Sequence, residues 1–153
     1  NWQQSDFDFV SYKQLLASFP KHIALAHETG RGLMASAGYF ATRVRYLKNI
    51  EHQQYAICDG GMNQNFLLAQ TENSFRKFKT PIIFSPTPHS KHNSCIFVGS
   101  SCSKDDVIGK QAEHHITPQV GDICIFENCG AYNASYTLSP FLKLPSAKTY
   151  IIE

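Results

Sequence analysis

The sequence has no long hydrophobic run, no excess of charge of one sign and no internal repeat. Nothing in its 153 residues approaches the roughly 18 consecutive apolar residues that a membrane-spanning helix needs. Fourteen Lys and Arg against twelve Asp and Glu leave a net charge of +2, and no window concentrates the basic residues. We therefore expect neither a membrane nor a nucleic acid as a partner.

Cysteine pairs of the Cys-x-x-Cys type are also absent. The chain has an odd number of cysteines, namely Cys58, Cys95, Cys102, Cys124 and Cys129. This favours free thiols in a reducing cytoplasm over a disulfide framework. The opening residues, NWQQSDFDF, contain no Met, no basic start and no apolar core, so we expect no secretory signal peptide.

The first thirty residues have the pattern of a helix followed by a strand. Residues 7–18 place Phe9, Tyr12, Leu15 and Leu16 on one helical face, and Pro20 ends the helix. The run HIALAH, residues 22–27, is short and mostly apolar, which is typical of a strand buried on both faces. This order suits half of a βαβ unit.

After residue 33 the pattern changes to that of a β protein. Residues 39–49 and 54–61 are rich in aromatic and β-branched residues, and they predict a hairpin that turns at IEHQ. Further short strands are expected at 81–87, 94–101, 122–126 and 148–153, and short helices after residue 62 and at 104–110. Loops rich in Pro, Ser, Asn, Asp and Gly separate the strands, as in a β-sandwich or Greek-key barrel.

The stretch HETGRG, residues 27–32, lies where the two patterns meet. Glycine lets a ligand approach the backbone closely, and arginine prefers phosphate or carboxylate. A ligand with a phosphate at one end and a protonated nitrogen at the other would use both the arginine and Glu28. The alternative is an ordinary turn after a strand with a surface ion pair.

Four stretches, in matching order over residues 23–153, resemble the pyridoxal-phosphate decarboxylases of the ornithine and diaminopimelate type. HETGRGLMASAGYFATRVRYLK is similar to that family's E-P-G-R segment, and YAICDGGMN to its D-G-G-M stretch. VGSSCSKDDVIG is similar to its cysteine motif, and GDICIFENCGAYNASY to its Gly-Ala-Tyr segment. The order of the four stretches carries the resemblance, because each alone is weak.

The resemblance implies a two-domain decarboxylase, with a TIM-type barrel followed by a β domain. Residues 1–32 would be the last helix and strand of the barrel, and residues 33–153 the β domain. A whole barrel takes about 250 residues, and the lysine that carries the cofactor would lie on an early barrel strand, upstream of this sequence.

The resemblance also implies a site for pyridoxal 5'-phosphate. Glu28 would face the ring nitrogen of the cofactor, while Gly30, Arg31 and Tyr132 would bind its phosphate. Cys102 would act as an acid in the active site of the other subunit of a homodimer, and Asp106 would brace the cysteine loop.

Departures from the family pattern bear on the substrate. Thr29 replaces the family's Pro, and Ser103 stands where diaminopimelate decarboxylases have a Glu. Their R-P-x-L-Y after D-G-G-M has no match in NQNFLLAQTENSFRKF. The chain looks closer to decarboxylases of carrier-protein-tethered aminoacyl groups and to exosortase-associated homologues. The substrate is thus expected to be an amino acid or a carrier-protein-tethered aminoacyl group.

Three other interpretations remain. His89 with His92, or His114 with His115, could ligate zinc, but adjacent side chains diverge on a strand, so surface histidines and no metal are expected. A catalytically inactive homologue could bind a partner protein, and a lysine on an early barrel strand would distinguish the enzyme from it. An alanine-racemase-like enzyme would lack the C-x-x-x-D pattern of Cys102 to Asp106.

Overall fold

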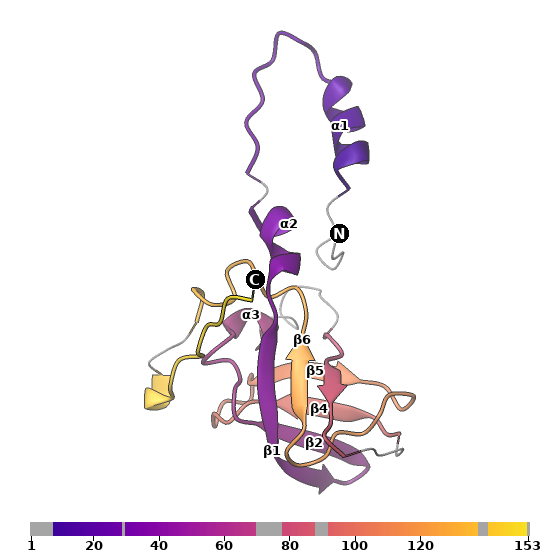
Figure 1. Cartoon of the computed structure of the whole chain (residues 1–153), viewed down its shortest axis with the longest axis vertical. Coiled ribbons are helices and arrows are strands. Elements are labelled where there is room, and N and C mark those ends of the chain that lie inside the picture. The colour runs from indigo at the N-terminus through magenta and orange to yellow at the C-terminus, as the bar shows by residue number, and fades with distance from the viewer. Residues whose placement is uncertain (1–7, 29, 70–77, 88–91, 138–140, 153) are drawn as a thin grey trace.

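One curled sheet dominates the computed structural model, which describes residues 8–28, 30–69, 78–87, 92–137 and 141–152 (Figure 1). Its strands lie in the order β3-β6-β1-β2-β4-β5, and every pair is antiparallel except β2 with β4. They are β1 (Phe40–Ile50), β2 (Gln53–Cys58), β3 (Ile82–Phe84), β4 (Cys95–Val98), β5 (Val107–Gln111) and β6 (Ile123–Phe126). The mainly-β fold predicted from the sequence is confirmed.

The predicted hairpin is β1 and β2. Along β1, Thr42 and Val44 are buried while Arg43 and Arg45 are exposed, which is the alternation of a strand that covers a core with one face. Ile50 pairs with Gln53, so the turn is only two residues long. Glu51 has a φ of 54°, as turns that match the twist of a hairpin require.

The core lies on the inner face of the curled sheet. Phe97 of β4 and Phe126 of β6 are fully buried and meet edge to face, with 6.3 Å between ring centroids. Around them pack small and branched side chains from the other strands, including Val44, Ala56, Cys58, Ile108 and Cys124.

Ahead of the sheet the chain forms an arm (Figure 1). The predicted first helix is present as α1 (Phe9–Ala17), and the carboxylate of Asp8 caps it by accepting from the amides of Val10 and Ser11 at 3.0 Å. Three large apolar side chains of α1 are exposed, namely Phe9 at 62%, Val10 at 70% and Leu15 at 58%, whereas Leu16 is half-buried. Within the described ranges, no helix has the length and apolar character needed to cross a membrane.

The expected buried strand at 22–27 is wrong. Residues 24–28 are extended but exposed, and in the described part of the chain no strand pairs with them. An extended segment without a neighbouring strand has no partner for its backbone groups and buries no side chains. The segment is held to α1 by a hydrogen bond between the Tyr12 hydroxyl and His27 Nδ1.

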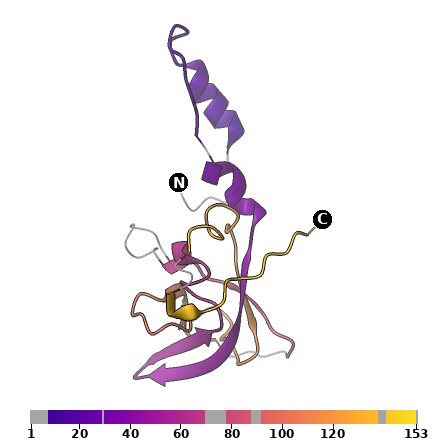
Figure 2. The same ribbon diagram turned by 90° about the vertical axis from the view of Figure 1, so that its left-hand side faces the viewer.

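Two further predicted elements differ in the structure. The expected helix at 104–110 is a turn followed by β5, because Val107–Gln111 pairs with β4 and because the Asp106 side chain bonds outside its own segment. The expected strand at 148–153 is irregular and exposed over 148–152, where it leaves the sheet (Figure 2), and Glu153 lies outside the described residues.

Short helices complete the chain. They are α2 (Gly30–Met34), η1 (Ala35–Ala37), α3 (Phe66–Ala69) and η3 (Phe141–Lys143). The brief helix expected after residue 62 is therefore confirmed as α3, although residues 70–77 of that segment lie outside the described residues. The division of the chain into parts at 1–32 and 33–153 stays a prediction.

Candidate cofactor-binding site

Arg31 lies on α2, between the arm and the first strand. Its side chain is half-buried and reaches the loop that follows β6, 100 residues further along the chain. There Nη1 donates to the carbonyl of Ala131 at 3.2 Å and to the side-chain oxygen of Asn133 at 3.5 Å. These two contacts position one edge of a guanidinium group that has five N–H donors in a rigid fork.

Tyr132 brings a hydroxyl to the same place. A Cβ atom added to Gly30 would stand 3.3 Å from Tyr132 Oη, so the bare glycine and the hydroxyl face one another. Tyr132 is 59% exposed and has a φ of 64°, which a bulky residue adopts rarely and at a cost of about 1–3 kcal/mol. Strained backbone of this kind gathers at functional sites.

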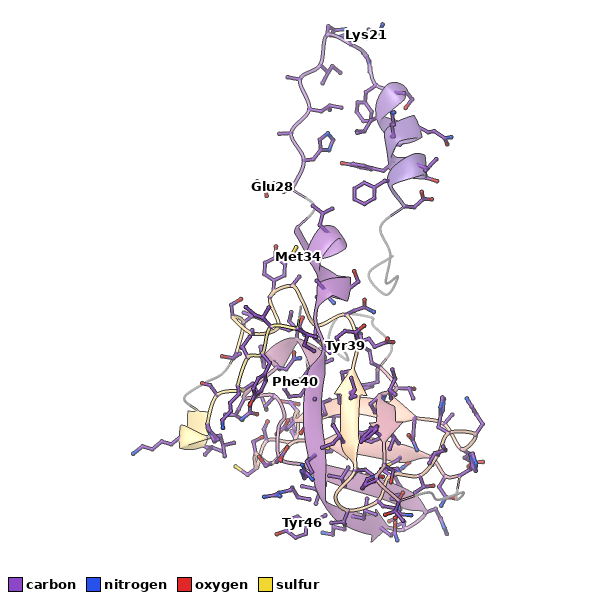
Figure 3. All side chains as sticks on the ribbon, viewed as in Figure 1. Lys21, Glu28, Met34, Tyr39, Phe40 and Tyr46 are labelled. Atoms are coloured by element: carbon purple, nitrogen blue, oxygen red, sulfur yellow. The ribbon has the colours of Figure 1, made fainter. Side chains whose placement is uncertain are left out.

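Glu28 and Cys102 occupy other places. Glu28 is exposed at the end of the arm, beyond Met34 in Figure 3, and Thr29, which separates it from Gly30, lies outside the described residues. Cys102 is exposed on the loop between β4 and β5. The structure thus brings together Gly30, Arg31 and Tyr132.

Two of the motif glycines exist because backbones touch. Gly38, which ends the Ala-Ser-Ala-Gly stretch, faces Gly130 so closely that its Cβ would lie 2.5 Å from the Cα of Gly130. A Cβ on Gly130 would lie 2.0 Å from the carbonyl oxygen of Met34. Hydrogen bonds from Gly130 N to Ala35 O, 2.9 Å, and from Cys129 N to Gly38 O, 2.7 Å, complete this contact. The close approach presents Tyr132 to α2.

Asp106 braces the cysteine loop, as predicted. It is 3% exposed, and its carboxylate accepts from the amide of Met62 at 2.7 Å. It also accepts from the amide and the hydroxyl of Ser101, at 3.0 and 2.6 Å. Cβ atoms on Gly61 or Gly99 would lie within 2.4 Å of this carboxylate, so both positions must lack a side chain. One buried acid therefore joins the D-G-G-M stretch to the Cys102 loop.

Sequence reasoning missed a pair of buried amides. Asn65 and Asn133 are 1% and 4% exposed, and Asn133 Nδ2 donates to Asn65 Oδ1 at 2.7 Å. The available signal was the polar run MNQN directly after an apolar strand, together with an asparagine beside Tyr132. Gln64, in the same run, ties the chain's last segment to the sheet by donating to the carbonyl of Pro145 at 2.6 Å.

Three of the histidines considered as metal ligands contact one another. His92 Nδ1 contacts the carbonyl oxygen of His114 at 3.0 Å, and the rings of His114 and His115 pack on each other. His89 lies outside the described residues. In the ranges that the structure describes, no group of three or more His, Cys, Asp or Glu has the arrangement of a metal site.

Residues 9–130 match the family model described as the pyridoxal-dependent decarboxylase C-terminal sheet domain, and the chain belongs to this family.

Similar proteins agree with this assignment. The chain is 28% identical over 149 residues to the diaminopimelate decarboxylase of Vibrio cholerae, and the match covers 92% of this chain and 34% of that protein. It is 28% identical over 123 residues to the L-glutamyl-[BtrI acyl-carrier protein] decarboxylase of Niallia circulans, and the match covers 78% of this chain and 28% of that protein. The structure of Helicobacter pylori diaminopimelate decarboxylase complexed with L-lysine superposes on this chain with a TM-score of 0.55 at 26% sequence identity. The superposition covers 72% of this chain and 26% of that one. The chain spans about a third of the length of the curated relatives it matches.

Proposed function

We propose that this chain is the carboxyl-terminal part of a pyridoxal-phosphate-dependent decarboxylase and that it binds the phosphate of the cofactor. The observation that carries the proposal is that the loop of Tyr132 meets Gly30 and Arg31, although about a hundred residues separate it from them in the sequence.

The residues present fit such a phosphate. A guanidinium fork suits phosphate oxygens, a phenol hydroxyl donates one more hydrogen bond, and a side chain at Gly30 would fill the space that faces this hydroxyl. Glu28 would accept a hydrogen bond from the ring nitrogen of the cofactor and so keep that nitrogen protonated. When bound, pyridoxal phosphate supplies an electron sink for the loss of a carboxylate.

Cys102 has a separate role in this proposal. Its exposed position on the β4–β5 loop, which Asp106 holds, suits a thiol that reaches into the site of a second subunit. There its S–H would deliver a proton to the α-carbon after CO₂ has left, which is general-acid work. A homodimer with shared sites follows, because each subunit completes the other.

The substrate that we propose is an amino acid or an aminoacyl group tethered to a carrier protein. One relative is a decarboxylase of the carrier-protein kind. Ser103 contributes to its own loop here, since its hydroxyl accepts from the amide of Asp105 at 3.2 Å and its amide donates to the hydroxyl of Ser101 at 3.3 Å. All five thiols are free, which supports a reducing compartment such as the cytoplasm.

Cofactor binding by arginine variants of the intact protein tests the proposal. Arg31→Ala removes a charge-assisted contact of about 1.5–3 kcal/mol, so the Kd for pyridoxal phosphate should rise by roughly 10- to 150-fold. Arg31→Lys should recover only part of this loss, because a point charge does not replace the planar fork. Arg45→Ala, at an exposed position on β1, is the matched control. If Arg31→Ala binds the cofactor as tightly as Arg45→Ala, the phosphate assignment is wrong.

A further inference from the structure

A line of hydrogen bonds leads from Arg31 into the interior of the sheet domain. Arg31 Nη1 contacts Asn133 Oδ1 at 3.5 Å, and Asn133 Nδ2 donates to Asn65 Oδ1 at 2.7 Å. Asn65 Nδ2 then donates to Cys129 Sγ at 3.6 Å, and this thiol donates to the carbonyl oxygen of Glu127 at 3.5 Å. The line joins α2, the Gly-Ala-Tyr loop and the segment after the D-G-G-M stretch.

The direction of every bond in this line follows from its first member. A guanidinium only donates, so Asn133 must turn its oxygen to Arg31 and its NH₂ to Asn65. Asn65 must in turn present its oxygen to Asn133 and its NH₂ to sulfur. Both amides therefore have one orientation that satisfies their neighbours, and a flip of either would set two donors against each other.

The far end of the line is also fixed. Burial raises the pKa of the Cys129 thiol, so the sulfur keeps its proton and can donate to the Glu127 carbonyl while accepting from Asn65. The backbone of Asn65 is itself anchored, since its amide donates to the carbonyl of Gly61 at 2.9 Å. A side chain that contacts Asn133 thus rests on a rigid part of the domain.

Buried amides are an expensive way to fill this space. Two nearly inaccessible asparagines lose their hydration, and an apolar residue of similar size would fill position 65 without that loss. What an apolar residue cannot do is orient Asn133, whose oxygen meets the guanidinium.

We propose that Asn65 and Asn133 are positioning residues that hold the Arg31 guanidinium where it meets the phosphate of the cofactor. This inference rests on the proposed function, in which Arg31 binds that phosphate. Two amides from segments 68 residues apart would thus set the orientation of the Arg31 side chain. In this role neither amide would bind the cofactor itself.

Phosphate discrimination tests the inference directly. For the intact protein stripped of cofactor, the Kd is measured by equilibrium dialysis for pyridoxal phosphate and for pyridoxal, which lacks the phosphate. We expect Asn65→Leu and Asn133→Ala each to lower the ratio of the Kd for pyridoxal to the Kd for pyridoxal phosphate by about tenfold, the scale of one net hydrogen bond. Pyridoxal binding itself should change little, since pyridoxal lacks the phosphate that Arg31 would bind.

The matched control is Gln111→Met. Gln111 is another buried amide, and its NH₂ donates to the carbonyls of Asn93 and Ile116 beside β5. All three variants should lower the melting temperature, because each leaves a polar group of a remaining residue without its hydrogen-bond partner, but Gln111→Met should keep the wild-type ratio of constants. A role in stability alone would move the melting temperature of all three and the ratio of none.

A double-mutant cycle separates phosphate binding by Arg31 from the positioning of Arg31 by the asparagines. In an Arg31→Ala background, Asn133→Ala should have no further effect on the ratio, because the group that it positions is gone. If Arg31→Ala lowers the ratio and neither asparagine variant does, the positioning role is refuted and the proposed function stands. If Arg31→Ala leaves the ratio unchanged, both fail. Should Asn65→Leu not fold, Asn133→Ala, at a loop position, decides the question alone.

Discussion

Replacing Asp106 by Asn should loosen the Cys102 loop by an amount that the structure allows us to estimate. The carboxylate accepts from Met62 N on one oxygen and from the amide and hydroxyl of Ser101 on the other. An amide side chain has one acceptor oxygen and one NH₂ group. If that oxygen stays with Ser101, the NH₂ faces the buried N–H of Met62, and two donors oppose each other.

The cost has two parts. A buried donor left without an acceptor costs about 1–3 kcal/mol, and the bonds to Ser101 lose the extra strength of a charged acceptor, about 1 kcal/mol more. The sum is about 2–4 kcal/mol. Since 1.4 kcal/mol is a factor of ten, local opening of the loop should be roughly 30- to 700-fold more frequent.

Hydrogen exchange followed by mass spectrometry of the intact protein measures this opening. Peptides that contain the amides of Met62 and Ser101 should exchange faster in Asp106→Asn, and those from α1 should not. Asp105→Asn is the control, because it makes the same chemical change one residue away at an exposed side chain. Equal exchange in the two variants would refute the view that Asp106 holds the loop.

Four further predictions concern packing and thiols. Gly130→Ala should lower the free energy of unfolding in urea by at least about 2 kcal/mol, because its Cβ would lie 2.0 Å from the Met34 carbonyl oxygen. The control Gly121→Ala, at a φ of 98° with open space around it, should lower it less. A larger loss of stability in Gly121→Ala than in Gly130→Ala would contradict the packing described. Alkylation at pH 8 should label exposed Cys102 and spare Cys95, because burial raises the pKa of Cys95 to about 12 and leaves roughly one thiol in 10⁴ ionised. The pKa of Cys95 in the folded protein lies above the ordinary value of 9.0. The stability that the neutral Cys95 thiol contributes is therefore present below about pH 9 and is lost as the pH rises towards 12. The free energy of unfolding, measured at a series of pH values, should show this loss. Cys102→Ala should bind cofactor normally and lose turnover, and mixing it with a variant that lacks the cofactor-bearing lysine should restore part of the activity; if a tagged pull-down shows mixed dimers without activity, Cys102 does not act across the interface.

The sheet was predictable where a single strand carries its own signal. The hairpin β1–β2 was predicted from the aromatic and β-branched residues of 39–49 and 54–61, which suit strands that pack against a core. The segment 22–27 has the composition of a strand, yet strand formation depends on neighbours that the described residues do not provide. The helix predicted at 104–110 was wrong for the opposite reason, because pairing with β4 outweighed a local preference for helix.

The site was predictable in part. The stretches that carry the family resemblance singled out Gly30, Arg31 and Tyr132, and the structure brings these three together. Their roles, and those of Glu28 and Cys102, stay predictions. The bond between Asn65 and Asn133 had no comparable signal, because it joins segments 68 residues apart that only the tertiary fold brings together.

The backbone of Tyr132 sets stability against function at a single torsion angle. Glycine adopts a φ of 64° freely, so Tyr132→Gly would relieve strain of about 1–3 kcal/mol while it removes the hydroxyl that faces Gly30. Selection for heat resistance alone would therefore favour a change that weakens the proposed phosphate site. An engineer who seeks a more robust form of this domain should gain stability elsewhere, and should treat a stabilising substitution at this position as a sign of lost binding.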